Sequence, residues 1–228
     1  MDGKKMAGEK AAELIEDGMI VGLGTGSTVY YTIKKLGERV QSGLHITGVP
    51  TSHATAKLAR ECGIPIADLN DTAQMDVTID GADEVDPSLD GIKGGGGALL
   101  FEKLVAKASK RNIWVVDSRK MVQKLGAFPL PVEVVPFGYK HLVKTFEREG
   151  LNPVLRMKEG RPYVTDGGHY IVDIRLQTPD IGAFGAWLDS ITGVVEHGLF
   201  LGICDLVVIG KGGKVYTRNR AEAKNVTL

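Results

Sequence analysis

The middle of the chain carries Met75-Asp-Val-Thr-Ile-Asp-Gly-Ala-Asp-Glu-Val-Asp86, a short apolar run that ends in a cluster of carboxylates. Next comes Lys93-Gly-Gly-Gly-Gly-Ala-Leu-Leu-Phe-Glu-Lys103, and residues 98–110 have the apolar spacing of a helix. A second apolar run of strand length follows at Ile113-Trp-Val-Val116. Strand, glycine-rich loop, helix and strand in this order predict two parallel strands joined by a crossover helix.

The same alternation continues on both sides of this stretch. We predict further strands at residues 19–23 and 46–49, and helices at 6–17, from 29 onward and at 52–61, with Ser52 as an N-cap. Three prolines between residues 128 and 136 then mark a boundary. The order βαββαβ that follows it is typical of a ferredoxin-like unit.

These patterns predict an α/β protein with two domains. The first is an open parallel-sheet, Rossmann-like domain made of residues 1–128 plus 204–228, to which the apolar run Leu206-Val-Val-Ile209 returns. The second is a smaller ferredoxin-like α+β domain at residues 129–203. A chain of 228 residues is long enough for two hydrophobic cores.

Composition limits the partners. Lys plus Arg and Asp plus Glu both number 28, so the net charge is zero, and neither nucleic acid nor a membrane surface is expected as the main partner. Cys62 and Cys204 lie far apart and match no metal-ligand spacing, which suggests buried thiols in a reducing compartment. The charged residues 1–6 do not resemble a signal peptide, and we expect a cytoplasmic protein.

Gly24-Thr-Gly-Ser-Thr28 lies between a predicted strand and a predicted helix. At such a position free amides and the helix dipole favour an anion such as phosphate. The loop is not a dinucleotide fingerprint, because Val29 stands where glycine or alanine is needed, and no Gly-Lys-Ser/Thr of a P-loop follows. The alternative is an ordinary strand-to-helix turn with a Ser or Thr cap.

The acidic stretch from Asp80 follows the next strand. Ligands of open α/β sheets bind outside the carboxyl ends of the strands, so we expect Asp80 and Asp83 to face a ligand. Gly81 and Ala82 keep the turn narrow, whereas Glu84 and Asp86 are expected in solvent. The alternative is an acidic surface turn without a function. No metal site is expected, since no further oxygen ligands recur at EF-hand spacing.

The glycines 94–97 could form a nest of amides for an oxyanion, with Lys93 adding a positive charge at its mouth. Side chains of a helix lean toward its N-terminus, so Glu102 should aim back at this loop. Taken singly, Lys93 and Glu102 would be surface residues. Together with Asp80 they supply a base, an anion stabiliser and an acid, the groups that move a proton next to a carbonyl.

Other polar residues point less clearly to a site. Lys120, in the turn after residues 113–116, could reach an anion at the same sheet edge, or it could be solvated. His53 is expected at the surface. Glu196 and His197 are expected as an exposed pair in the smaller domain.

Several motifs in the same order resemble the ribose-5-phosphate isomerase family of type A. The resemblance covers nearly the whole chain and rests on Gly22-Leu-Gly-Thr-Gly-Ser-Thr28, Val49-Pro-Thr-Ser52, Asp80-Gly-Ala-Asp83, Lys93-Gly-Gly-Gly-Gly97, Glu102-Lys103, Phe128-Pro-Leu-Pro-Val-Glu133 and Glu196-His-Gly-Leu-Phe200. It implies a cytosolic enzyme of the non-oxidative pentose phosphate pathway without a cofactor, active as a homodimer or homotetramer. Many members have Arg immediately before the catalytic Glu, and this chain has Phe101 there.

The resemblance also implies residue roles. Glu102 would be the catalytic base, and Lys93 with the loop amides would hold a cis-enediolate. Asp80 would assist opening of the sugar ring, and Asp83 would either position Lys93 or relay a proton between two sugar oxygens. Substrate contacts are implied for Thr25, Gly26, Ser27, Thr28, Asp80, Gly81, Ala82, Asp83, Lys93, Gly94, Gly95, Gly96 and Lys120.

Three other function classes compete with this one. A transferase of the CoA-transferase type has a similar fold and uses a glutamate as a nucleophile, but the chain is short for a CoA site with two acyl pockets. A sugar-phosphate sensor would need a DNA-binding segment, and no basic helix-turn-helix pattern is visible. A nucleotide-binding oxidoreductase lacks its glycine fingerprint here.

Overall fold

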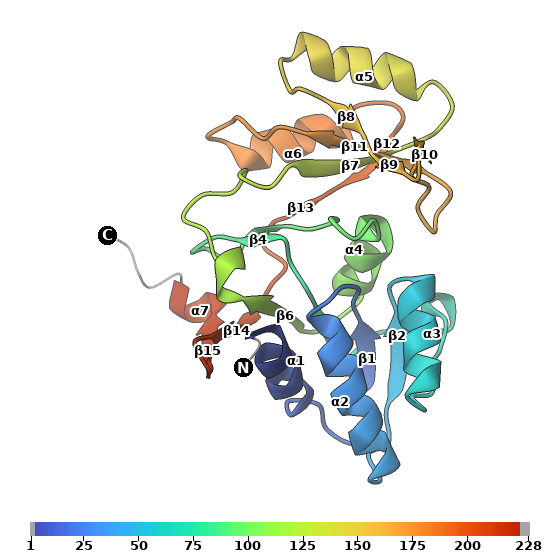
Figure 1. The fold of residues 1–228 in the computed structure, drawn as a ribbon, viewed down its shortest axis with the longest axis vertical. Helices are drawn as coiled ribbons and strands as arrows, with labels where there is room; N and C mark the ends of the chain where they lie inside the picture. The colour runs from blue at the N-terminus through green and yellow to red at the C-terminus, as the bar shows by residue number, and fades with distance from the viewer. Residues whose placement is uncertain (1–2, 224–228) are drawn as a thin grey trace.

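The computed structural model describes residues 3–223, whose elements are labelled in Figure 1. Residues 1–2 and 224–228 of the predicted Rossmann-like domain lie outside the described part of the chain. None of the helices within residues 3–223 combines the length and the apolar character needed to span a bilayer.

The larger sheet has six strands in the order β15-β14-β6-β3-β1-β2. These strands are β1 (Ile20–Leu23), β2 (Thr47–Pro50), β3 (Val77–Asp80), β6 (Asn112–Asp117), β14 (Leu206–Lys211) and β15 (Lys214–Asn219). All neighbouring strands pair in parallel except β15, which pairs antiparallel with β14 at one edge. The structure therefore confirms the open, mostly parallel sheet that the sequence predicts.

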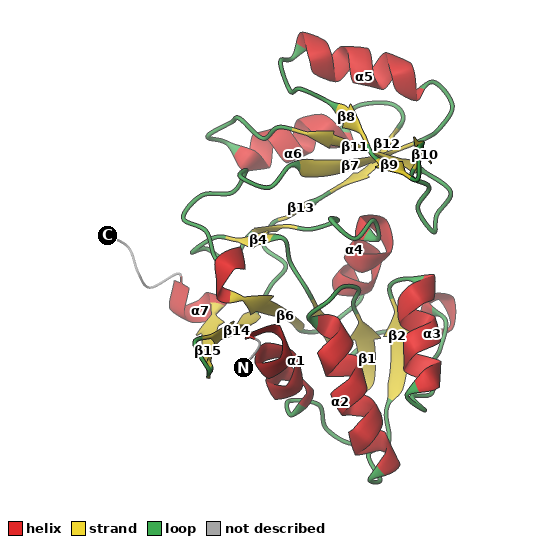
Figure 2. Cartoon of the chain, in the orientation of Figure 1, coloured by secondary structure: helices red, strands yellow, loops and turns green. Residues whose placement is uncertain are grey.

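Helices cover both faces of this sheet (Figure 2). They are α1 (Gly3–Ala12), α2 (Val29–Gln41), α3 (His53–Glu61), α4 (Leu99–Lys107) and the short α7 (Arg220–Ala223), with single turns η1 (Leu69–Asp71) and η2 (Ser118–Lys120). α1 and α2 pack together on one face, whereas Val105 of α4 packs against Val49 and Met75 on the other. The Ser52 hydroxyl accepts the Thr55 amide at 3.1 Å, which confirms the predicted cap of α3.

A smaller four-stranded sheet lies above the larger one in Figure 1 and has the order β12-β7-β11-β8. Its elements are β7 (Leu130–Val134), α5 (Tyr139–Arg148), β8 (Val154–Leu155), β11 (Tyr170–Ile174), α6 (Ile181–Asp189) and β12 (Val194–His197). The pairs are antiparallel, in the order of a ferredoxin-like unit. The chain after β8 forms a further short strand, because β9 (Met157–Lys158) pairs with β10 (Arg161–Pro162) as a hairpin.

A third sheet, which the sequence did not indicate, connects the two layers. It joins β4 (Glu84–Val85) and β5 (Gly91–Ile92) to β13 (Leu199–Phe200). Contrary to the prediction, Glu84 is buried there, where its carboxylate accepts the amides of Gly126 and Phe128, both at 2.7 Å. This carboxylate therefore fastens the chain segment that leads into the smaller sheet.

The topology of the larger sheet fixes where a ligand can bind. From β1 the chain crosses to β2 on one side, and from β3 it crosses to β6 on the other. The loops that follow β1 and β3 therefore diverge and leave a crevice at the carboxyl ends of these strands, the usual position of ligands in open α/β sheets. The smaller sheet and the upper end of α4 stand over this crevice (Figure 1).

Candidate active site

A cavity of about 280 Å³ lies in this crevice. Its walls are Lys4, Thr25, Gly26, Ser27, Thr28, Gly81, Ala82, Asp83, Lys93, Gly94, Gly96, Glu102, Asp117 and Lys120. The lining thus includes every predicted site residue except Asp80, which is buried behind Lys93, and Gly95, which is exposed. Lys4 and Asp117 also line the cavity, and no sequence pattern indicated either of them.

The loop after β1 is fixed to the end of β3 by Asp80. The Asp80 Oδ1 atom accepts the amides of Thr25 at 3.1 Å and Gly81 at 2.7 Å, so that one carboxylate oxygen orders both loops. Glycine is required at position 24, because a Cβ there would lie 2.0 Å from the same oxygen. The Thr25 hydroxyl continues this network to Thr51 at 2.8 Å.

One end of the cavity has the character of a phosphate site. Thr28 stands at the N-cap of α2 and makes no capping bond with its side chain. The Tyr30 and Tyr31 amides donate to the carbonyls of Gly26 and Thr28, at 3.0 and 3.1 Å, whereas the amides of Ser27 and Thr28, two residues of the cavity wall, have no acceptor within residues 3–223. Lys4 Nζ donates to the Ser27 hydroxyl at 2.9 Å. Lys120 lies on the opposite wall, 3.9 Å from Asp83 Oδ1. Two ammonium groups and a helix N-terminus thus surround this end.

The other end of the cavity contains a buried trio of charges. Lys93 Nζ lies 2.9 Å from Asp80 Oδ2 and 3.3 Å from Glu102 Oε2, and it donates to the Gly81 carbonyl at 2.6 Å. All three side chains are at most 5% exposed. Beyond this ion pairing, the two carboxylate oxygens that face Lys93 have no hydrogen-bond partner among the described residues.

Two carboxylates sharing one ammonium cannot both ionise easily in a buried site. Burial and the nearby charge of Asp80 raise the pKa of Glu102 to about 8, against the opposing effect of Lys93. Burial also raises the pKa of Asp80, although Lys93 acts to lower it. For Lys93, burial acts to lower the pKa, but the charges of Asp80 and Glu102 outweigh it and raise the pKa. The site therefore holds a fixed cation beside a carboxyl that titrates near neutral pH.

The glycine loop offers fewer free amides than its sequence suggests. The Gly95 amide donates to Asp83 Oδ2 at 2.7 Å, and the Gly97 amide donates to the Gly94 carbonyl at 3.0 Å. Within residues 3–223 the amides of Gly94 and Gly96 have no such acceptor, so these two are available to a ligand. Asp83 thus binds the loop and makes no direct contact with Lys93, which Asp80 holds instead.

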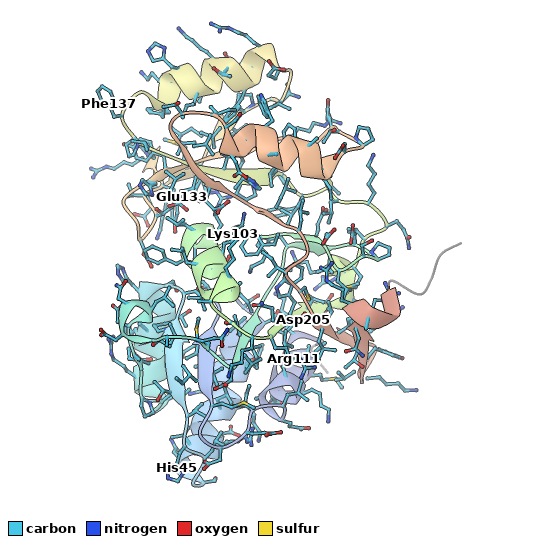
Figure 3. The ribbon with its side chains drawn as sticks, turned by 180° about the vertical axis from the view of Figure 1, so that it is seen from behind. His45, Lys103, Arg111, Glu133, Phe137 and Asp205 are labelled. Atoms are coloured by element: carbon cyan, nitrogen blue, oxygen red, sulfur yellow. The ribbon has the colours of Figure 1, made fainter. Side chains whose placement is uncertain are left out.

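Lys103 follows Glu102 on α4 and points to the smaller sheet, below Glu133 in the view of Figure 3. Its ammonium donates to Glu196 at 2.6 Å and to the His197 carbonyl at 2.7 Å. The ring of Phe200 lies 4.8 Å from this ammonium and 5.3 Å from that of Lys93. These contacts attach the N-terminal half of α4, and with it Glu102, to strands β12 and β13.

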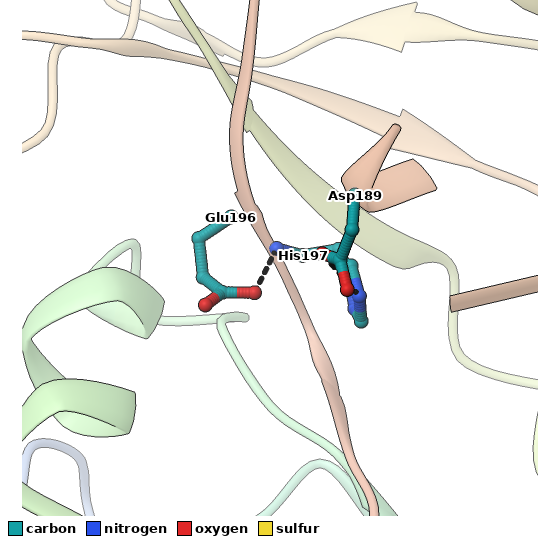
Figure 4. A group of neighbouring side chains, drawn as sticks. All are labelled: Asp189, Glu196 and His197. Carbon is teal, nitrogen blue, oxygen red and sulfur yellow. Dashed lines mark hydrogen bonds and ion pairs between the residues drawn. The ribbon is translucent and has the colours of Figure 1, made fainter. Parts of the chain in front are cut away.

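Glu196 and His197 are therefore not the exposed pair that the sequence predicts (Figure 4). His197 is buried, its Nδ1 accepts the Leu199 amide at 3.2 Å, and its Nε2 lies 3.2 Å from Asp189 Oδ1. Burial, followed by the charge of Lys103, lowers the pKa of His197 to about 4. The Nδ1 lone pair of His197 already accepts an amide, and the Glu196 carboxylate already binds Lys103. The group of Asp189, Glu196 and His197 therefore does not fit a metal ion.

Phe101 occupies a different surface from the cavity. It lines a groove between α3 and α4 together with Leu104 and Ala56. The departure at this position from the family pattern therefore leaves the walls of the cavity unchanged. His53 is exposed beside the same groove and binds Asp166 through its amide at 2.7 Å, as expected of a surface residue.

Comparisons with known proteins point to one family. The family model of ribose 5-phosphate isomerase A (phosphoriboisomerase A) matches residues 47–214. A relative from Listeria monocytogenes serotype 4b, named ribose-5-phosphate isomerase A, is 59% identical over 210 residues, which are 91% of this chain and 94% of the relative. A relative of the same name from Enterococcus faecalis is 53% identical over 213 residues, 92% and 94% of the two chains.

Solved structures show the same similarity. A D-ribose-5-phosphate isomerase in complex with phospho-erythronic acid superimposes with a TM-score of 0.92 and 40% identity, over 96% of this chain and all of the other. Ribose 5-phosphate isomerase A from Methanocaldococcus jannaschii gives a TM-score of 0.91 and 36% identity, over 96% and 98% of the two chains. The fold is thus that of an isomerase, the class to which these relatives belong. The chain belongs to the ribose 5-phosphate isomerase A family.

Proposed function

We propose that the protein interconverts D-ribose 5-phosphate and D-ribulose 5-phosphate through a cis-enediolate, with Glu102 as the general base. The observation that carries the proposal is the cavity itself. One end presents Lys4, Ser27 and the start of α2, and the other presents Glu102 with Lys93 3.3 Å away. A phosphorylated sugar fits such a cavity with its phosphate at the first end and its carbonyl at the second.

The proton transfers can be written so that every atom is accounted for. In the open-chain aldose, Glu102 removes the proton from C2, and the electron pair forms the C1–C2 double bond while the carbonyl pair moves to O1, which gives an enediolate with its negative charge on O1. The proton of the C2 hydroxyl passes to O1, and Glu102 then returns its proton to C1. General base catalysis of this kind contributes roughly a hundred- to ten-thousand-fold.

Lys93 and the amides of Gly94 and Gly96 are the groups that stabilise the enediolate. The ammonium is held in place by Asp80 and the Gly81 carbonyl before the substrate arrives, so no reorganisation is needed when negative charge develops. The complex of the solved relative with phospho-erythronic acid supports this assignment, since that molecule combines a phosphate with a carboxylate.

The positions of the two aspartates change the roles that the sequence suggested. Asp80 lies beneath Lys93 behind the cavity wall, whereas Asp83 is part of the wall. We therefore assign the sugar hydroxyl protons, in ring opening and in the relay between O1 and O2, to Asp83, and we assign the fixing of Lys93 to Asp80. The proposal retains a cytoplasmic homodimer or homotetramer of the pentose phosphate pathway that needs no cofactor.

The direct test is to incubate the purified protein with D-ribose 5-phosphate in the presence of EDTA and without added cofactor. Ketose should appear until an aldose–ketose equilibrium is reached, and D-ribulose 5-phosphate should give the same mixture. A protein that forms no ketose, but transfers acyl groups from an acyl-CoA through a hydroxylamine-sensitive Glu102 adduct, would be a transferase instead.

The pH profile of kcat/KM should follow the free carboxyl of Glu102. Because its pKa is raised to about 8, the base is mostly protonated at lower pH, and kcat/KM should fall about tenfold per pH unit below that value and level off above it. The charge of Asp80 is one cause of the raised pKa, so Asp80→Asn should move the midpoint to lower pH. A profile that stays flat from pH 6 to 9 would contradict the protonation state proposed here.

Lys4 should contribute to binding the phosphate. Replacing it by Ala removes one charge-assisted hydrogen bond, and KM for ribose 5-phosphate should rise by roughly tenfold while kcat changes little. The matched control is Lys5→Ala, since Lys5 is the next residue but forms only an exposed pair with Glu9 at 3.8 Å. Equal KM values for the two variants would remove Lys4 from the phosphate site.

A further inference from the structure

The glycine loop is held from outside the cavity by a residue of the smaller sheet. Arg156, between β8 and β9, donates through Nη1 to the Gly94 carbonyl at 2.7 Å and to the Gly95 carbonyl at 3.3 Å. Its Nε and Nη2 atoms bind both oxygens of Asp173 on β11, at 2.9 and 2.5 Å. Both side chains are at most 20% exposed. The guanidinium thus joins the sheet to the loop with a fixed geometry.

Of the two peptide units that Arg156 holds, one binds Asp83 and the other carries an amide of the cavity wall. In a trans peptide the C=O of one residue and the N–H of the next point in opposite directions. The Gly94 carbonyl belongs to the unit whose N–H, on Gly95, donates to Asp83 at 2.7 Å. The Gly95 carbonyl belongs to the unit whose N–H is the uncommitted amide of Gly96, a residue of the cavity wall.

The far end of the loop is confined by the same segment of chain. Gly97 has a φ of +81°, and a Cβ there would lie 2.4 Å from the Tyr163 hydroxyl oxygen. The Tyr163 amide in turn donates to the Arg156 carbonyl at 2.9 Å. The loop therefore cannot turn its peptide planes without displacing the β9–β10 hairpin that carries these residues.

We propose that Arg156, anchored by Asp173, is a positioning residue of the isomerase. It fixes the planes of the 94–95 and 95–96 peptide units, so that the first holds the Asp83 carboxylate and the second aims its amide at the developing oxyanion. It touches no substrate atom and acts only through these two peptide units. This inference rests on the proposed function, because it assigns the two units to the enediolate site.

The test compares Arg156→Met, Arg156→Lys and Asp173→Asn with the parent enzyme. In Arg156→Met, kcat should fall by about tenfold, less than the loss for a direct oxyanion donor, while KM for ribose 5-phosphate stays within about twofold because the phosphate end is untouched. Lysine supplies one charged donor without the planar fork, so Arg156→Lys should recover part of kcat. Asp173→Asn keeps the arginine but weakens its anchor, and should give an intermediate loss.

A second readout does not depend on turnover. The affinity for phospho-erythronic acid, measured by calorimetry, should fall in these variants in parallel with kcat, because its carboxylate carries the charge that the loop amides would bind. The affinity for inorganic phosphate should not change. If the parent lacks isomerase activity, the proposed function fails, and the two affinities still decide whether Arg156 orders an anion site.

Arg220 provides a matched control for a purely structural role. Its side chain is also 18% exposed and binds the carbonyls of Cys204 and Leu89 together with Asp90, none of which lines the cavity. Arg220→Met should lower thermal stability without changing kcat or the affinity for phospho-erythronic acid. The proposal is overturned if the Arg156 variants behave in the same way, with lower stability but unchanged kcat and unchanged binding.

Discussion

Replacing Glu102 by Gln should lower kcat for the isomerisation of ribose 5-phosphate by roughly a hundred- to ten-thousand-fold. The amide keeps the shape of the side chain but cannot accept the C2 proton, and Lys93 with the loop amides remains to bind the enediolate. KM should stay within a few-fold, because the phosphate end of the cavity is unchanged. Steady-state rates from both directions of the reaction measure this loss.

Stability separates a chemical effect of Glu102→Gln from damage to the fold. The carboxyl of Glu102 has a pKa of about 8 in the folded protein, well above its usual value, so its ionised form is unfavourable in the folded state. Glu102 therefore lowers the free energy of unfolding least at low pH, and this destabilisation grows as the pH rises toward 8. The Gln variant should unfold at the same temperature as the parent or higher, most clearly above pH 8. Turnover close to that of the parent would exclude Glu102 as the base.

The parts of the site that the sequence predicts are those built from neighbours along the chain. The carboxylates after β3, the glycines before α4 and the Ser52 cap each depend on a few consecutive residues, and the rule for parallel sheets places the carboxyl ends of strands together. Glu102 could be aimed at the loop from helix geometry alone, because a side chain in the first turns leans toward the N-terminus.

The parts that the sequence did not predict depend on contacts between distant segments. Lys4 reaches the cavity only because α1 packs beside α2 and beneath the loop after β1. Arg156 approaches the loop from a hairpin that lies 62 positions further along the chain from Gly94. The sequence predicts Glu84 in solvent as part of an acidic cluster. Its carboxylate is instead buried and accepts two amides that lie more than 40 residues further along the chain.

Contacts between distant segments also explain why the sequence alone could not distinguish the roles of Asp80 and Asp83. Asp80 is the last residue of β3 and Asp83 follows three positions later, so both carboxylates lie at the carboxyl edge of the sheet. Their roles diverge because Lys93 pairs with Asp80 at 2.9 Å, whereas Asp83 accepts the Gly95 amide at 2.7 Å. Only the packed loop determines which carboxylate holds a cation and which one is free to exchange protons with a sugar.

Replacing Lys93 by Met should have the largest combined effect on activity and stability. Loss of the charge that faces the enediolate should lower kcat by roughly a hundred- to a thousand-fold, with a smaller effect on KM.

Removing one member of a buried ion pair also destabilises a protein by about 3–5 kcal/mol, since Asp80 and Glu102 would face each other without a cation. These carboxyls would then have pKa values raised further, so the stability deficit should be small at pH 5 and grow as the pH rises. Calorimetric unfolding at pH 5 and 9, with kinetics at a temperature where the variant is folded, measures both effects. A variant that loses affinity alone, at unchanged kcat, would show that Lys93 binds the substrate without stabilising the enediolate.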